Sequence, residues 1–172
     1  LIKEDPKNKA RYYYALGRIQ KRQTEYDKAI ELFEISVYEK PRYLSPYREM
    51  AECYILMDKF QEAERCITKA HEIDDSNIFV ILLEARLAQK QGRPEYAIDL
   101  LENATALNQE SSQVFFRKGR AFDQLGNSIE ACKCYNESLQ YNSKMYDAEL
   151  CLLSHQVLSN PEIAKKRLEQ LK

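Results

Sequence analysis

The sequence predicts an all-α protein in which antiparallel helix pairs stack in one direction as a solenoid. Three observations predict this fold. The 172 residues include only 4 glycines and 5 prolines, whereas alanine, leucine, glutamate, lysine and glutamine are frequent throughout, a composition that favours helix over sheet. The sequence also matches itself at an interval of 34 residues. Each interval holds two apolar patterns of helical spacing, separated by a short breaker.

The 34-residue register is visible as columns of similar residues. The small columns are Ala29, Ala63, Ala97 and Ala131, then Gly17, Ala51, Ala85 and Gly119, and the bulky columns are Tyr13, Tyr47, Ile81 and Phe115, then Phe33, Ile67, Leu101 and Tyr135. A small column opposite a bulky one indicates close helix packing. A glycine within a helix costs about 1 kcal/mol relative to alanine. We therefore expect Gly17 and Gly119 to be points where a large side chain approaches bare backbone.

The helices follow in order along the chain. We expect first helices at residues 10–23, 46–57, 79–91 and 113–125, and second helices at 26–40, 60–73, 94–108 and 128–140. The breakers inside the pairs are Thr24, Asp58, Gly92 and Gly126. Ser45 before Pro46, and Asn160 before Pro161, predict capped helix starts, and Asp58 with Gln61 resembles a capping box.

These elements predict one solenoid domain of four full repeats, at residues 10–43, 44–77, 78–111 and 112–145. Residues 1–9 read as the tail of a preceding repeat, which indicates a fragment of a longer protein. Residues 146–172 keep the register less well, and we expect a divergent or capping helix pair there.

The first and fourth copies resemble the tetratricopeptide repeat family. The first copy matches the family pattern at Tyr13, Leu16, Gly17, Ala29, Phe33 and Pro41, and the fourth at Phe115, Gly119, Phe122, Ala131 and Tyr135. Gln20, Ser36 and Lys118 depart from it, and Glu84 replaces the leucine of the third copy. The resemblance covers residues 10–145. It implies a right-handed superhelix whose first helices line a concave groove and whose second helices form the back.

Composition and motifs exclude several classes of function. The chain has no glycine-rich phosphate loop, no metalloprotease histidine pair and no nucleophile elbow, so we expect no enzyme activity, no cofactor and no metal site. His71 and His155 lie in different repeats, and Cys132 and Cys134 point to nearly opposite faces of a helix. Five cysteines without framework spacing favour a reducing, cytoplasmic compartment. No apolar run could span a membrane.

Charge separates the two helix series although the net charge is only −1. The four first helices carry ten basic and four acidic side chains, and the four second helices carry five basic and twelve acidic. With the family's arrangement, the groove would be basic and the back acidic. The alternative is that these charges are simply the solvated face of each helix.

We expect the groove to bind its partner through arginines, lysines and interleaved apolar side chains. The predicted groove residues are Arg11, Tyr14, Arg18, Arg22, Arg48, Phe79, Leu82, Arg86, Lys90, Phe116, Arg117 and Arg120. Tyr14, Leu82 and Phe116 would be apolar anchors, and the planar guanidinium groups suit carboxylates and phosphates. The family's carboxylate clamp for chaperone C-termini is poorly matched, because Tyr14, Arg18 and Glu49 stand at its positions.

The sequence therefore predicts a non-enzymatic protein-protein interaction scaffold that binds an acidic peptide or helical segment. One alternative is single-stranded RNA or another nucleic acid in the same groove, because arginines with aromatic rings also suit bases and phosphates. Another is a regulatory or sensor arm of a larger enzyme or signalling ATPase. Self-association through the terminal repeats is a further possible interaction.

Overall fold

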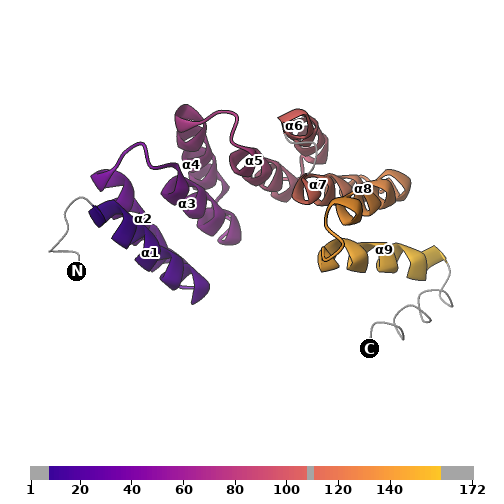
Figure 1. Cartoon of the computed structure of the whole chain (residues 1–172), viewed down its shortest axis with the longest axis horizontal. Coiled ribbons are helices and arrows are strands. Elements are labelled where there is room, and N and C mark those ends of the chain that lie inside the picture. The colour runs from indigo at the N-terminus through magenta and orange to yellow at the C-terminus, as the bar shows by residue number, and fades with distance from the viewer. Residues whose placement is uncertain (1–7, 108–110, 160–172) are drawn as a thin grey trace. The chain divides into compact units, whose positions relative to one another are not determined.

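The computed structural model describes residues 8–107 and 111–159, and every regular element within them is an α-helix (Figure 1). The helices are α1 (Lys9–Arg22), α2 (Tyr26–Glu39), α3 (Leu44–Leu56), α4 (Phe60–Ile73), α5 (Ile78–Lys90), α6 (Pro94–Leu107), α7 (Ser112–Gln124), α8 (Ser128–Tyr141) and α9 (Tyr146–Ser159). The all-α prediction is confirmed. Across the described ranges no helix has the length and apolar character that crossing a membrane requires.

The chain divides into two compact units between Gln91 and Gly92, a point inside the range 78–111 predicted as the third repeat. In the first unit each helix from α1 to α5 packs on the next, and α3 also contacts both α1 and α5. In the second unit α6, α7, α8 and α9 pack in the same serial order. Alternate helices of the first unit therefore form a continuous surface of α1, α3 and α5, which we call the first-helix face.

Four turns, spaced 34 residues apart, share one backbone conformation. Their left-handed residues are Thr24 (φ 62°), Asp58 (φ 54°), Gly92 (φ 73°) and Gly126 (φ 72°), which are the four predicted breakers. At the second turn the Lys59 N–H donates to the Tyr54 carbonyl at 2.9 Å, and the Asp58 N–H donates to the Ile55 carbonyl at 3.3 Å. These bonds satisfy carbonyls that the end of α3 would otherwise leave without donors.

The predicted caps at Ser45 and Asp58 are wrong. Helix α3 begins at Leu44, so Ser45 and Pro46 are its second and third residues, and no side chain caps its start. Pro46 is tolerated because the first four N–H groups of a helix have no partner within it. Asp58 ends α3 in the left-handed conformation instead of capping α4. The predicted cap at Asn160 lies outside the described residues.

The small and bulky columns form the cores of both units. Ala29, Ala63, Ala97 and Ala131 are all 0% exposed. A methyl group built on Gly17 would lie 2.5 Å from Cε1 of Phe33, and one on Gly119 would lie 2.6 Å from Cε1 of Tyr135. Any larger residue would displace these buried rings, which confirms the predicted close approach at both glycines.

Candidate binding surface

The first-helix face carries nine of the twelve predicted groove residues. Arg11, Tyr14, Arg18 and Arg22 lie on α1, Arg48 lies on α3, and Phe79, Leu82, Arg86 and Lys90 lie on α5. The remaining three, Phe116, Arg117 and Arg120, lie on α7 in the second unit. A single surface shared by all twelve stays a prediction.

Arginines and aromatic rings gather along α1, beside Tyr43. The Arg18 guanidinium lies 5.8 Å from the centre of the Tyr14 ring, and the Tyr14 and Tyr43 rings are 5.3 Å apart. Burial raises the pKa of the Tyr43 hydroxyl, while the nearby charges of Arg11 and Arg18 act to lower it. Arg11 is exposed. The cluster therefore presents cationic groups beside aromatic surface, a combination that binds anions next to apolar groups.

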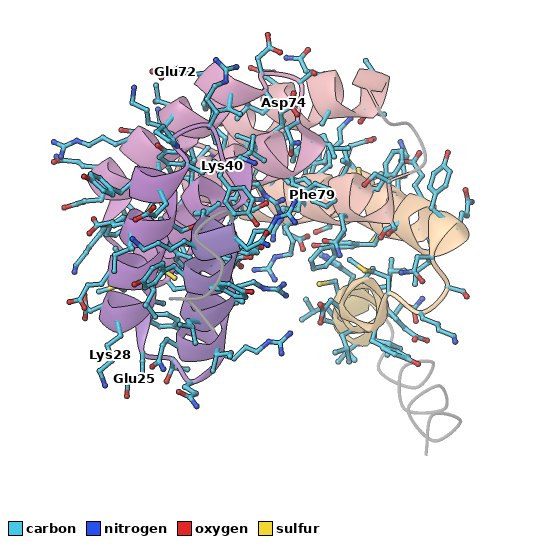
Figure 2. All side chains as sticks on the ribbon, turned by 60° about the vertical axis from the view of Figure 1, so that its left-hand side comes forward. Glu25, Lys28, Lys40, Glu72, Asp74 and Phe79 are labelled. Carbon is cyan, nitrogen blue, oxygen red and sulfur yellow. The ribbon has the colours of Figure 1, made fainter. Side chains whose placement is uncertain are left out.

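A second arginine–aromatic pair links α3 and α5. The Arg48 guanidinium lies 4.7 Å from the centre of the Phe79 ring. Phe79 belongs to the first turn of α5 (Figure 2) and is 56% exposed. Leu82, one turn further along α5, is half-buried. We call Arg11, Tyr14, Arg48 and Phe79 the aromatic half of the first-helix face.

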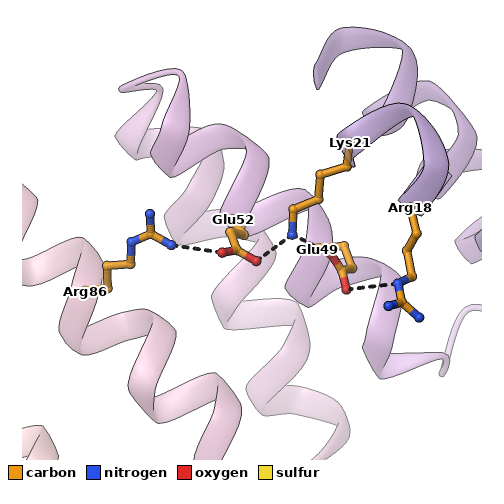
Figure 3. A network of polar contacts seen from close by, with 5 residues as sticks. All are labelled: Arg18, Lys21, Glu49, Glu52 and Arg86. Atoms are coloured by element: carbon orange, nitrogen blue, oxygen red, sulfur yellow. Dashed lines mark hydrogen bonds and ion pairs between the residues drawn. The ribbon is translucent and has the colours of Figure 1, made fainter. Parts of the chain in front are cut away.

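The other half of this face is an alternating network of charges (Figure 3). Nζ of Lys21 lies 2.5 Å from Glu49 Oε2 and 2.5 Å from Glu52 Oε2, so one ammonium group bridges both carboxylates of α3. Nη1 of Arg86 on α5 donates to Glu52 Oε1 at 2.9 Å. Nε of Arg18 lies 4.0 Å from Glu49 Oε1. This half is therefore mixed in charge, whereas the sequence predicted a basic lining.

The network shifts the pKa values of its central members. Burial acts to lower the pKa of Lys21, but hydrogen bonds to Glu49 and Glu52 outweigh burial and raise it. Burial acts to raise the pKa of Glu52, but Lys21 and Arg86 outweigh burial and lower it. Both groups therefore stay charged across the physiological range of pH, and the network joins α1, α3 and α5.

Sequence reasoning did not select Lys21 as a site residue. A signal was present, because Lys21 follows Arg18 by one helical turn and Glu49 and Glu52 have the same spacing on the next first helix. Beyond this network, Lys90 Nζ on α5 lies 3.6 Å from Asp58 Oδ1. Three predicted groove cations, Arg18, Arg86 and Lys90, thus have carboxylates of this chain as partners.

An open hollow of about 220 Å³ lies where α1 ends beside α3. It is lined by Arg18, Lys21, Arg22 and Glu49. Arg22 is exposed, and the Arg18 side chain is 49% exposed. The hollow therefore presents three cations and one carboxylate to solvent.

In the second unit Phe116 has the surroundings that Tyr14 has in the first, because each ring packs beside a buried aromatic ring of its own hairpin. The Phe116 ring lies 5.9 Å from the Tyr135 ring and packs against the core. Arg120 is exposed and Arg117 is half-buried. The neighbouring Lys118 pairs with Glu102 of α6, with Nζ and Oε1 2.8 Å apart.

Each of the two histidines pairs with a carboxylate of a neighbouring helix. His71 Nε2 lies 2.9 Å from Glu84 Oε2, and His155 Nε2 lies 2.7 Å from Asp123 Oδ1. Burial raises the pKa of the Cys66 thiol to about 12, which disfavours the nucleophilic thiolate. Within residues 8–107 and 111–159, no three His, Cys, Asp or Glu side chains are grouped to hold a metal ion.

Two family models, both described as the tetratricopeptide repeat, match residues 13–42 and 82–141. Together these ranges contain 90 of the 172 residues. Among curated proteins no relative matches the chain.

Solved structures with the same fold include several repeat proteins. TTC0263, a thermophilic TPR protein in Thermus thermophilus, aligns at a TM-score of 0.79 with 21% identity, over 89% of this chain and 84% of its own. The pilF protein of Pseudomonas aeruginosa aligns at 0.81 with 18% identity, over 94% and 74%. YrrB, described as a TPR protein with an unusual peptide-binding site, aligns at 0.64 with 19% identity, over 98% and 87%. At these identities the likeness shows the fold alone, a helical repeat solenoid.

Proposed function

The chain belongs to the tetratricopeptide repeat family, a family of protein-protein interaction scaffolds, and we propose that its first-helix face binds an acidic peptide or helical segment of a partner protein. The observation that carries this proposal is the aromatic half of the face. There Arg48 stacks on Phe79, and Arg11 and Arg18 lie around Tyr14 and Tyr43. Apolar side chains of the partner would pack on the rings, while its carboxylates pair with the guanidinium groups.

A peptide is a better fit to this surface than a nucleic acid. In the charge network of Lys21, Glu49, Glu52 and Arg86, two carboxylates interrupt the row of cations that a continuous phosphate backbone would need along this face. The exposed ring of Phe79 provides an apolar anchor. The peptide-binding site named for YrrB, a protein of the same fold, supports a peptide ligand.

The proposal includes two further points. The second-unit residues Phe116, Arg117 and Arg120 would contribute contacts of their own to the partner. The protein would act without catalysis in a reducing, cytoplasmic compartment, since all five cysteines are free thiols in the structure.

Selection from a random displayed peptide library tests the function. We expect the enriched peptides to combine acidic and apolar residues, and Arg48→Glu to weaken their binding at least about tenfold, which is about 1.4 kcal/mol. Phe79→Ala should weaken the same peptides by removing the apolar anchor. Arg65→Glu, which reverses an exposed charge on α4, is the matched control and should bind normally. Enrichment of basic peptides, or equal binding by R48E and R65E, would contradict the proposal.

A salt titration separates this function from RNA binding. An apolar-anchored peptide should lose little affinity between low and physiological salt. A single-stranded oligouridine that bound through several phosphates would show a steep log–log slope. Tight, steeply salt-dependent binding of oligouridine would favour the nucleic-acid function instead.

A further inference from the structure

The hollow beside the end of α1 brings several cations and carboxylates together, whereas the aromatic half places its two arginines beside aromatic rings. Its lining and the attached network contain the cations Arg18, Lys21, Arg22 and Arg86 and the carboxylates Glu49 and Glu52. Four cations and two carboxylates leave a net charge of +2. A single carboxylate would neutralise half of this charge, whereas a phosphate monoester dianion would neutralise all of it.

The cationic side chains of the hollow differ in how closely they already contact carboxylates. Lys21 is fixed by two carboxylates at 2.5 Å. Arg18 meets Glu49 only through Nε, at 4.0 Å, and its terminal nitrogens extend beyond that contact (Figure 3). Arg22 is exposed on the next turn of α1. Two guanidinium groups can therefore turn their planar donor forks to a ligand, while Lys21 supplies a fixed positive charge.

The C-terminal end of α1 repels an anion less than a helix C-terminus whose carbonyl groups lack donors would. The turn N–H groups take up its last carbonyls: Gln23 donates to Ile19 and Gln20, and Thr24 donates to Lys21 at 3.0 Å. Carbonyls engaged in this way contribute less negative potential toward the hollow.

The second unit provides an internal comparison, because α7 repeats the α1 register 102 residues later. Arg18 corresponds to Arg120, but Lys21 corresponds to Asp123 and Arg22 to Gln124. Glu49 corresponds to Cys151 on α9. The same fold position in the second unit therefore has one cation and one carboxylate, so the cationic hollow is particular to the first unit.

We propose that this hollow is a subsite for a phosphate monoester, carried as a phosphoserine or phosphothreonine side chain by the peptide bound to the first-helix face. The inference rests on the proposed function, since the peptide would carry the phosphate, and it adds a regulation: phosphorylation of the partner would strengthen capture. An RNA backbone would not satisfy the site, because each phosphodiester has only one negative charge.

Titration of the whole chain with small phosphate probes tests the subsite without any peptide. The probes are N-acetyl-phosphoserine amide, N-acetyl-glutamate amide and inorganic phosphate, followed by NMR of the arginine Nε–Hε signals. We expect the phosphoserine amide to shift the signals of Arg18 and Arg22 and to bind at least about fivefold more tightly than the glutamate amide. Equal affinity of these two amides would overturn the proposal. Tighter binding of inorganic phosphate than of the phosphoserine amide would overturn the assignment to a side chain.

Substitution of the two exposed arginines of the hollow tests whether the phosphate subsite lies on α1. Arg18→Gln and Arg22→Gln should each weaken the phosphoserine amide about fivefold or more. Arg65→Gln, which removes an exposed charge on α4, should leave its affinity unchanged. Both arginines of the hollow are exposed, so these substitutions should not disturb folding. Unchanged binding by R18Q and R22Q, or equal loss in R65Q, would refute the location.

The pH dependence identifies the dianion. The second pKa of a phosphate monoester is about 6, so lowering the pH from about 7.5 to about 5.5 should reduce the affinity for the phosphoserine amide about fourfold. Affinity for the glutamate amide should change little over this range. A flat profile for the phosphoserine amide would contradict recognition of the dianion.

This experiment is independent of the peptide selection. Arg48→Glu and Phe79→Ala should weaken peptide capture while the phosphoserine amide still binds the hollow. Failure of the subsite would leave the peptide function standing, and failure of peptide capture would leave the phosphate measurement valid.

Discussion

The hairpin α1–α2 and the hairpin α7–α8 have nearly the same internal packing. Each places a glycine against a buried aromatic ring, Gly17 against Phe33 and Gly119 against Tyr135. The aromatic pairs beside them have the same interplanar angle of 43°, with centroid distances of 6.0 Å and 5.9 Å. A buried serine also bonds across each hairpin, from Ser36 Oγ to the Ala10 carbonyl at 2.7 Å and from Ser138 Oγ to the Ser112 carbonyl at 2.8 Å.

The two hairpins differ at several charged positions, and the difference between Lys21 and Asp123 changes a contact with a further helix. Lys21 on α1 pairs with the carboxylates of α3, whereas Asp123, at the same register on α7, accepts from the Tyr135 hydroxyl at 2.5 Å and lies 2.7 Å from His155 Nε2 on α9. Phe33 has no hydroxyl, so the first hairpin needs no acceptor there. The comparison shows that packing geometry is common to both hairpins and that α1 and α7 are tied to the helices of matching register, α3 and α9. The charge at this position decides which side chains make that contact.

The largest effect should come from breaking the shared packing. Gly17→Ala and Gly119→Ala each force a methyl group against a buried ring. Overpacking costs about 1–3 kcal/mol, and the better helix propensity of alanine returns about 1 kcal/mol. Because the added methyl would lie 2.5 Å from Phe33 or 2.6 Å from Tyr135, we expect the cost at its upper end, so that each variant lowers the free energy of unfolding by about 2 kcal/mol in urea denaturation followed by circular dichroism.

A compensating change checks that the ring is the cause. Phe33→Leu combined with Gly17→Ala should lose less stability than the sum of the two single changes, because the smaller side chain makes room for the methyl group. Strict additivity, or a stabilising effect of either glycine substitution alone, would show that the close approach does not limit these positions.

A smaller effect should come from making the second hairpin resemble the first. Tyr135→Phe removes the hydroxyl that donates to Asp123, a hydrogen bond to a charged acceptor. We expect a loss of about 1–2 kcal/mol in the free energy of unfolding. The reverse change, Phe33→Tyr, should gain no stability, because Lys21 stands where the second hairpin has its acceptor. A stabilising Phe33→Tyr would contradict this reading of the difference.

Tyr135→Phe should also change how the free energy of unfolding depends on pH in alkaline solution. Burial, followed by the hydrogen bond to Asp123, raises the pKa of Tyr135 above its ordinary value of 10.0. A group with a raised folded pKa stabilises the protein below its unfolded pKa, and that stability is lost as pH rises further. Wild-type protein should therefore lose more stability than Tyr135→Phe as the pH rises above 10.0.

The smallest effect should come from the charge network that only the first unit has. Lys21 and Arg86 overcome the effect of burial and hold the pKa of Glu52 below 4.5. This contribution is present at neutral pH and is lost as pH falls below that value. Glu52→Gln should therefore destabilise the neutral protein by less than about 1 kcal/mol, since the group is partly exposed, and should show less further loss in acid.

Glu31→Gln on α2 serves as the control for Glu52→Gln, because it removes one exposed carboxylate and tests the effect of net charge alone. Acid unfolding curves of the two variants give the comparison. If they coincide, the network does not contribute to the stability of the first unit.

Much of the fold could be predicted because its signals are local or strictly periodic. The breakers at Thr24, Asp58, Gly92 and Gly126 have the left-handed backbone that a turn between paired helices requires. The predicted caps failed at Ser45 and Asp58, because the choice between capping the next helix and closing the previous one depends on a shift of one or two residues. Helix boundaries are set by this balance of hydrogen bonds rather than by residue type alone.

Less of the candidate site could be predicted. Residue type and register predicted Arg18, Arg48, Phe79 and Arg86 as groove residues. The structure pairs Arg48 with Phe79. Counting charges could not show that Glu52 would bond to both Lys21 and Arg86. Such bonds depend on side-chain conformations across three helices, and a sum of charges contains no information about distance.

The sequence alone determined the helical repeat, the turns and the glycine contacts with aromatic rings, because a period of 34 residues places the same small and large side chains together in every copy. Only the tertiary structure decided which charges neutralise one another and which remain open to a ligand. Ion pairing falls off with the distance between individual atoms, and for Lys21, Glu49, Glu52 and Arg86 those distances are fixed by how α1, α3 and α5 pack.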